Sequence, residues 1–215
     1  MAVAALNVGA DVFQTDFSST PPGTRFIGTP VIEDGVLKLT KPVNSAFGAM
    51  AIGPFAPLTI NNMVATWKSR VGGGAGGGAD GYSFNVGSDL ADAFTAEEGT
   101  GTGLTVTIDT FDNGTGQDVG VDIKYGGARI GYAGIPKDNP GNGIFLRKDA
   151  FVDAALSLSS SGNVTFIYDG TTVSATILGF TGLAANQMMF AGRTGGANDN
   201  QWIRSEERRV GKECA

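Results

Sequence analysis

Acidic and amide side chains are concentrated in one short segment, TIDTFDNGTGQD, at residues 107–118. Carboxylate and amide oxygens are preferred ligands of Ca²⁺, so Asp109, Asn113 and Asp118 are candidates for a metal site. On a strand, Asp109 and Phe111 share one face, and the Asn-Gly pair that follows can turn the chain back toward Asp109. The same residue types are also common in plain turns. The segment is therefore a metal site, a catalytic site or a plain turn, and the elements that hold it decide between these three.

The composition excludes several other kinds of chemistry. The 215 residues contain no His, which removes His-based catalytic triads and most transition-metal sites. The net charge of −6 and the pI near 4.6 argue against nucleic acid as a partner, because such proteins carry a basic surface. No apolar run approaches the ~20 residues of a membrane span, so no membrane insertion is predicted.

The charged tail RSEERRVGKECA, residues 204–215, differs from the rest of this charge-poor chain. It resembles the translation of a sequencing adapter, and we interpret it as a non-native scar on a metagenomic fragment. A genuine charged helix is the alternative. The tail contains Cys214, the only cysteine, so the remainder has no thiol chemistry. Under this interpretation the natural domain covers residues 13–203 and is truncated before its last strand.

Short runs of β-branched and aromatic residues recur between Gly, Asn, Asp and Pro, which is typical of strands. The predicted strands are residues 25–32, 36–40, 46–52, 60–71, 81–86, 103–111, 119–125, 128–133, 152–159, 163–168, 172–178 and 187–192. Asp-Gly pairs at 34–35 and 169–170 predict hairpin turns. A helix of one or two turns is predicted only within 88–98, and the run GGGAGGG at 72–78 is expected to be a loop within one domain. The pattern predicts an all-β fold, an antiparallel β-sandwich or jelly roll.

Three segments resemble legume-type (L-type) lectins of the concanavalin A-like lectin/glucanase superfamily. They are ADGYSF at 79–84, GLTVTIDTFDN at 103–113 and NVTFIYDGTTVSATI at 163–177. The resemblance implies a concanavalin A-like jelly roll. It also implies a cis peptide bond between Ala79 and Asp80.

The same resemblance implies a calcium site beside a sugar site. The implied Ca²⁺ ligands are Asp109, the carbonyl of Phe111, Asn113 and Asp118. The implied carbohydrate contacts are Asp80, Gly81, Gly99, Phe111 and Asn113, and Glu97 and Glu98 are placed beside Gly99 at the pocket. Asp112 and Asp122 are expected on solvated faces, and Trp67 is expected in the core.

The chain departs from the family pattern at the second metal site. That site uses a Glu two residues before the Asp and a His downstream, whereas this chain has Thr107 and no His. A transition-metal site is therefore not expected. The glucanases of the superfamily carry a motif that resembles Glu-x-Asp-x-x-Glu. In this chain Thr107 replaces the first glutamate and Asp112 replaces the second, so no catalysis is predicted.

These observations favour a non-catalytic carbohydrate-binding or adhesion module, with Ca²⁺ as cofactor and a glycan or polysaccharide as partner. The expected context is a bacterial multidomain protein that is extracellular or on the cell surface. The alternative is a structural spacer module whose sugar site is degenerate. A glycoside hydrolase is the third and least favoured reading.

Overall fold

The computed structural model describes residues 4–8, 11–114, 118–141 and 143–205. This part of the chain forms strands joined by turns and loops, with one short 3₁₀ helix, η1 (Ala96–Glu98). The strands are β1 (Ala4–Val8), β2 (Asp11–Thr15), β3 (Thr24–Gly28), β4 (Val31–Glu33), β5 (Val36–Thr40), β6 (Phe47–Ile52), β7 (Leu58–Ile60), β8 (Met63–Gly72), β9 (Gly81–Gly87), β10 (Leu104–Asp109), β11 (Gly120–Tyr125), β12 (Ala128–Ala133), β13 (Val152–Leu158), β14 (Asn163–Tyr168), β15 (Thr171–Thr176), β16 (Leu183–Ala185), β17 (Gln187–Arg193) and β18 (Asn200–Arg204).

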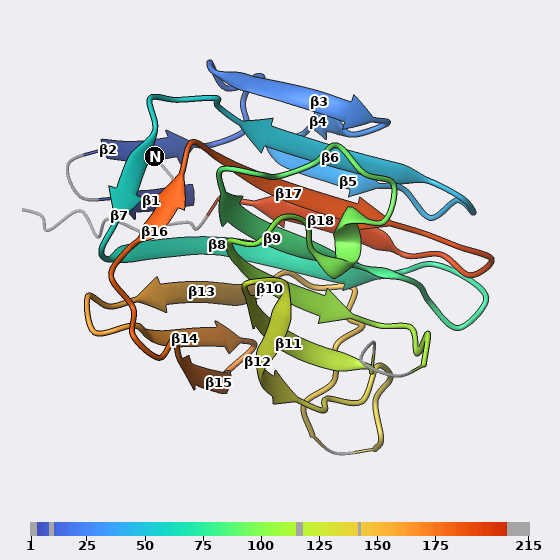
Figure 1. Ribbon diagram of the computed structural model, residues 1–215. Coiled ribbons are helices and arrows are strands. Elements are labelled where there is room, and N and C mark those ends of the chain that lie inside the picture. The colour runs from blue at the N-terminus through green and yellow to red at the C-terminus, as the bar shows by residue number, and fades with distance from the viewer. Residues whose placement is uncertain (1–3, 9–10, 115–117, 142, 206–215) are drawn as a thin grey trace, which may run out of the picture.

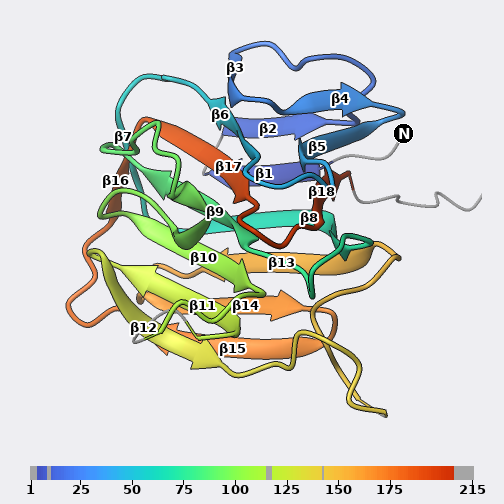
Figure 2. The same cartoon turned by 90° about the vertical axis from the view of Figure 1, so that its right-hand side faces the viewer.

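Two large antiparallel sheets are stacked face to face (Figures 1 and 2). The front sheet has the order β12-β11-β10-β9-β17-β6-β3. The back sheet has the order β15-β14-β13-β8-β18-β5-β4, and β1 pairs with both β8 and β2. A small third sheet joins β7 to β16. The prediction of an all-β antiparallel sandwich is confirmed.

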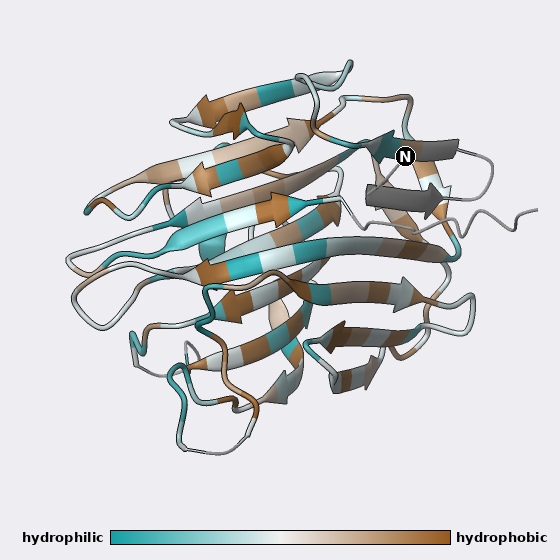
Figure 3. Ribbon diagram, turned by 180° about the vertical axis from the view of Figure 1, so that it is seen from behind, coloured by the Kyte–Doolittle hydropathy of each residue, from teal (hydrophilic) through white to brown (hydrophobic). Residues whose placement is uncertain are grey.

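The core lies between the two large sheets, where aromatic side chains from both meet. Trp67 of β8 is 2% exposed, and its ring centroid lies 5.2 Å from that of Phe84 and 5.3 Å from that of Phe190 in the front sheet. Phe166 of β14 stacks on the same indole at 5.8 Å. Hydrophobic and hydrophilic bands alternate along many strands because successive side chains point to opposite faces (Figure 3). The expected core position of Trp67 is confirmed.

The two Asp-Gly pairs form the predicted hairpin turns. Asp34 and Gly35 have φ of 56° and 71° between β4 and β5. Asp169 and Gly170 have φ of 49° and 80° between β14 and β15. Positive φ at both central residues is the geometry that matches the twist of paired strands, and Asp and Gly tolerate it.

Several strand boundaries differ from the sequence prediction. Residues 25–32 do not form one strand: β3 pairs with β6 in the front sheet, whereas β4 pairs with β5 in the back sheet. Residues 60–71 are divided between β7 and β8. The predicted helix within 88–98 is reduced to η1. Strands β1, β2, β16 and β18 were not predicted, because their short sequences have no strong alternation.

The last described strand crosses the predicted tail boundary. Arg204 belongs to β18 and pairs with Val36 of β5 and Lys68 of β8. Residues 206–215, including Cys214, lie outside the described residues. The domain boundary at 203 and the non-native origin of the tail stay predictions.

The outer face of the front sheet is covered next to the candidate site. A second apolar cluster joins that face to the segment that contains η1; its buried members are Ala49, Ala51, Leu90, Ala96, Met189 and Ala191. This packing places Glu97 and Glu98 of η1 over β9, β10 and β17.

The glycine-rich segment 72–78 connects β8 of the back sheet to β9 of the front sheet. Asp199 Oδ1 accepts a hydrogen bond from the Gly74 amide at 2.9 Å, and Asn198 Oδ1 accepts one from the Ala75 amide at 3.0 Å. Asp199 is fully buried and forms an ion pair with Arg147 at 2.6 Å. These contacts fix the connection directly before Asp80. No helix in the described part of the chain has the length and hydropathy needed to cross a bilayer.

Candidate functional site

Four chain segments meet at one end of the front sheet. Gly81, the first residue of β9, pairs with Asp109 at the end of β10 and with Arg193 at the end of β17. Asp109 also pairs with Gly120 at the start of β11. The residues just beyond these strand ends therefore converge on one place.

Asp80 is held at the centre of this end by its backbone. The Ala79–Asp80 peptide bond is cis, as the resemblance implied. The Asp80 carbonyl accepts hydrogen bonds from the amide and the hydroxyl of Thr110, at 2.8 and 3.0 Å. Gly81 has φ of 139°, and a Cβ atom there would lie 2.1 Å from the Ile108 carbonyl oxygen, so only glycine fits. The Asp80 carboxylate is thus rigidly placed beside β10.

Arg193 binds the carboxylate of Asp80. The Arg193 Nε atom lies 2.6 Å from Asp80 Oδ2, and Arg193 Nη1 lies 2.9 Å from Glu97 Oε1. The guanidinium also lies over the Phe94 ring, 5.1 Å from its centroid. Arg193 was not identified from the sequence; the only signal is one basic residue at the end of an otherwise uncharged strand.

The carboxyl groups that Arg193 contacts are nearly inaccessible. Asp80 and Glu97 are each 3% exposed. Burial raises the pKa of Asp80, and the charge of Arg193 opposes that shift. Burial raises the pKa of Glu97 to about 7, again against the charge of Arg193. The expected place of Glu97 beside the site is consistent with this ion pair.

Asp109 has one satisfied and one unsatisfied carboxyl oxygen. Its Oδ1 accepts a hydrogen bond from the Phe111 amide at 2.8 Å, whereas its buried Oδ2 has no hydrogen-bond partner among the described residues. Burial, followed by the negative charge of Glu98, holds the pKa of Asp109 well above its usual range. Glu98 is bound in turn by Lys124, whose ammonium lies 2.6 Å from the Glu98 carbonyl and 3.4 Å from Oε2. An unpartnered buried carboxyl oxygen is the kind of atom that a bound cation satisfies, so Asp109 fits a Ca²⁺ ligand.

The remaining predicted sugar contacts are Phe111, Asn113 and Gly99. Phe111 is 39% exposed and Asn113 is exposed, so neither is buried away from a ligand. Gly99 ends η1 with φ of 100°, and a Cβ atom there would lie 2.7 Å from the side chain of Thr105 on β10. Asp112 is exposed as expected, and it accepts a hydrogen bond from the Gly114 amide at 2.8 Å.

Asp118 and Asp122 are joined by Arg129. Arg129 Nη1 lies 2.7 Å from Asp118 Oδ2, and Arg129 Nε lies 2.5 Å from Asp122 Oδ1. The expectation that Asp122 is solvated is wrong, because Asp122 is fully buried. Thr107 Oγ1 lies across the sheet and donates to Asp122 Oδ2 at 3.2 Å. Burial raises the pKa of Asp122, opposed by Lys124 and Arg129.

The structure brings some of the predicted site residues together and separates others. Asp80, Gly81 and Asp109 are joined by strand pairing and by the Thr110 hydrogen bonds. The side chain of Asp118 is directed to Arg129. Within the described residues, no three Asp or Glu side chains converge as a ready metal site.

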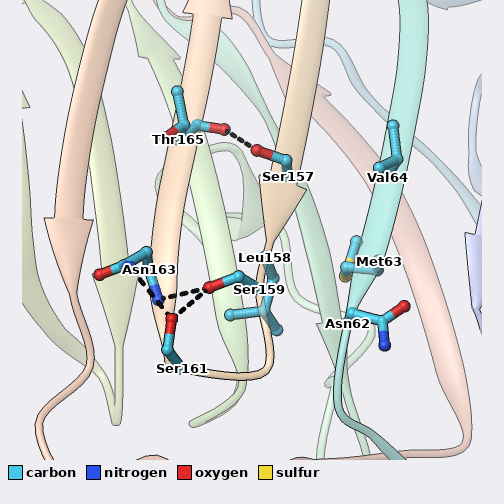
Figure 4. A pocket seen from close by; sticks show the side chains of 9 residues that line it. All are labelled: Asn62, Met63, Val64, Ser157, Leu158, Ser159, Ser161, Asn163 and Thr165. Atoms are coloured by element: carbon cyan, nitrogen blue, oxygen red, sulfur yellow. Dashed lines mark hydrogen bonds between the residues drawn. The ribbon is translucent and has the colours of Figure 1, made fainter.

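A separate cavity of about 350 Å³ lies on the back sheet (Figure 4). The lining residues lie on β8, β13 and β14 or directly beside these strands: Asn62, Met63, Val64, Ser157, Leu158, Ser159, Ser161, Asn163 and Thr165. The nine lining residues include no charged and no aromatic side chain. Hydroxyl and amide groups of the lining form hydrogen bonds with one another. For example, Asn163 Nδ2 donates to Ser161 Oγ at 3.0 Å. None of the predicted site residues lies there.

Comparison with known proteins gives a clear result for the fold. No protein-family model and no curated protein sequence matches the chain. Among solved structures, the Ca²⁺- and mannose-bound exoplasmic/lumenal domain of VIP36 superposes with a TM-score of 0.67, at 17% identity over 87% of this chain and 83% of that one. The lectin from Bauhinia forficata in complex with GalNAc gives 0.66, at 18% identity over 88% and 93%. The potassium-bound carbohydrate recognition domain of Emp46p gives 0.65, at 13% identity over 87% and 91%. The chain therefore has the concanavalin A-like fold of L-type lectins, as its motifs predicted.

Proposed function

We propose that this chain is a non-catalytic carbohydrate-binding module that uses Ca²⁺ to organise its sugar site. The observation that carries the proposal is the buried Oδ2 of Asp109, which has no hydrogen-bond partner in the described part of the chain. Asp109 pairs with Gly81, the residue that follows Asp80, at the end of the front sheet. A glycan or polysaccharide is the partner in this proposal, and the parent is an extracellular or cell-surface multidomain protein.

Four groups would hold the calcium ion. They are the carboxylates of Asp109 and Asp118, the carbonyl of Phe111 and the side-chain amide of Asn113. These groups would supply oxygen ligands to the ion, and the ion would neutralise the charge of the buried Asp109 carboxylate. Such an oxygen-only ligand set is suited to Ca²⁺ rather than to a transition metal.

The sugar would bind beside this ion. Asp80, whose side chain keeps 4% of its surface exposed, would accept hydrogen bonds from sugar hydroxyls through Oδ1, the carboxyl oxygen that Arg193 does not use, and Asn113 would add an amide. Gly81 and Gly99 would contribute backbone groups to the sugar site. The exposed ring of Phe111 offers an apolar surface for a sugar face.

The first experiment is thermal melting in EDTA and then in millimolar CaCl₂. Calcium at a hundredfold over its Kd stabilises the folded state by about 2.7 kcal/mol. For a domain of this size this raises Tm by roughly 5–10 °C. The shift should disappear in Asp109→Ala and persist in Asp112→Ala, because Asp112 is exposed and only closes a turn. Titration with mannose and with GalNAc, in calcium and in EDTA, then tests sugar binding.

A structural spacer is the second candidate, and one observation favours it. The carboxylates of Asp80 and Asp118 are both occupied by arginines, as in a site closed by internal ion pairs. A cooperative transition with no calcium shift, and no heat on titration with either sugar, would support the spacer and exclude the lectin.

Catalysis is not part of the proposal. Thr107 donates a hydrogen bond to Asp122 and offers no nucleophile, and Asp112 is turned into solvent. A retaining glycosidase needs two carboxyl groups that flank the scissile bond, and positions 107 and 112 do not supply such a pair.

A further inference from the structure

Arg129 is fixed on all sides in a way that an ordinary surface arginine is not. Its guanidinium binds Asp122 through two nitrogens, Nε at 2.5 Å and Nη2 at 3.3 Å, and binds Asp118 through Nη1 at 2.7 Å. Its flat face lies over the Tyr132 ring, 4.5 Å from the centroid. The Tyr132 hydroxyl in turn donates to the Val119 carbonyl at 2.9 Å.

A β-bulge in β12 produces this arrangement. Lys124 of β11 pairs with Arg129, whereas the preceding residue, Ile123, pairs with Gly131, so Ile130 of β12 is an extra residue without a partner in the pairing. Beyond the bulge, Asp122 pairs with Tyr132. Without the bulge, Arg129 and Tyr132 would point to opposite faces, because they are an odd number of residues apart. The bulge brings both onto the face that carries Asp122.

The buried partner of Arg129 requires a fixed cation. Asp122 is fully buried, and a buried carboxylate is tolerated only when it is paired and hydrogen-bonded. Thr107 supplies one hydrogen bond and Arg129 supplies the charge. Neither Thr107 nor Arg129 is a metal ligand, so the donor set around Asp122 does not fit a transition metal.

The exposed partner of Arg129 is a proposed calcium ligand. The Asp118 side chain is 49% exposed, and the contact with Arg129 uses its Oδ2. Asp118 lies two residues before Gly120, which pairs with Asp109. Holding Asp118 therefore fixes one ligand relative to the other.

We propose that Arg129 is a built-in cation that positions Asp118 for calcium, so that this site needs no second metal ion. Arg129 is a positioning residue and does not touch the calcium ion. The inference rests on the proposed calcium function. It adds that Arg129 of β12 takes the place of a second metal ion, so that calcium is the single metal at the site.

The test measures calcium affinity by isothermal titration with CaCl₂ on the full chain, with and without MnCl₂. The variants are Arg129→Met, which removes the charge, and Arg129→Lys, which keeps the charge without the fork. Arg70→Met is the matched control, because Arg70 also pairs with an exposed carboxylate, Asp149 at 3.2 Å, and lies over an aromatic ring, that of Trp202 at 4.4 Å.

We expect Arg129→Met to weaken calcium binding at least tenfold, Arg129→Lys to weaken it less, and Arg70→Met to leave it unchanged. Wild-type affinity should be the same with and without Mn²⁺. Urea denaturation in EDTA should show coupling between Arg129→Met and Asp118→Asn, a readout that needs no calcium. If Arg129→Met does not fold, Arg129→Lys must still show the weakened binding.

Four results would overturn the inference. Unchanged calcium affinity in the Arg129 variants would show that Arg129 is only structural, and tighter affinity would show that it competes with calcium for Asp118. A tenfold gain in wild-type affinity on adding Mn²⁺ would reveal a second metal. A wild-type protein that binds no calcium refutes the proposed calcium function itself, and the inference falls with it.

Discussion

The carboxyl group of Asp109 must lose a proton before it can bind calcium, which makes calcium affinity depend on pH. Burial, with the charge of Glu98 second, holds the pKa of Asp109 well above its usual range. An ordinary Asp, with a pKa of about 3.9, is already ionised at pH 6. A metal that binds a protonated ligand releases the proton, so affinity should rise as pH rises.

The expected magnitude follows from one proton per calcium ion. While the pH stays below the pKa of Asp109, apparent affinity changes about tenfold per pH unit. Lowering the pH from 8 to 6 should therefore weaken binding about 100-fold, or by about 2.7 kcal/mol. Glu97, whose pKa burial raises to about 7, titrates in the same range. The Glu97→Gln variant separates its contribution.

Isothermal titration with CaCl₂ at pH 6, 7 and 8 provides the assay, with two buffers of different ionisation enthalpy at each pH. The buffer dependence of the heat counts the protons released, and we expect a number near one for the wild type and for Glu97→Gln. Asp112→Asn is the control and should keep the same slope. Equal calcium affinity at pH 6 and pH 8, with heats that do not depend on the buffer, would refute the assignment of Asp109 as a protonated ligand.

Three further predictions concern stability. In EDTA, Tm should fall as pH rises, because burial raises the folded-state pKa of Glu97 from 4.5 to about 7. The stability that the protonated Glu97 contributes is complete below pH 4.5 and is lost above pH 7. A Tm that rises between pH 4.5 and pH 7 would contradict this prediction. Asp199→Asn should cost about 3–5 kcal/mol in urea denaturation because it breaks the buried ion pair with Arg147, and a cost under about 1 kcal/mol would show that the pair is dispensable. Gly81→Ala should lower the free energy of unfolding by at least about 2 kcal/mol, because its Cβ atom would lie 2.1 Å from a backbone oxygen of β10. Gly196→Ala is the control and should be neutral, because no atom lies within contact distance of its Cβ position. Equal stability of the two variants would disprove the steric argument.

Much of the fold was predictable from local sequence patterns. The Asp-Gly turns at 34–35 and 169–170 were identified because positive φ is a property of those residues themselves. The motifs at 79–84 and 103–113 predicted both the lectin fold and the cis bond before Asp80. Trp67 was expected in the core because it lies in the middle of a predicted strand. Strand boundaries were less accurate, since the division of 25–32 between two sheets depends on which strands lie alongside.

The charge arrangement of the candidate site was decided by the tertiary structure alone. Asp122 was expected in solvent because it lies between apolar neighbours of a strand that could expose one face, yet both faces of β11 are covered there. Arg193 is 113 residues away from Asp80, and its role becomes visible only when β17 pairs with β9. Arg129 reaches Asp118 and Asp122 because of a bulge that no sequence pattern marks. The sequence by itself determined most of the strands, the two Asp-Gly turns and the acidic residues available at this end of the sheet. Which of these acids are buried, and which cation faces each one, depends on side chains from distant segments, because only packing removes water and brings opposite charges into contact.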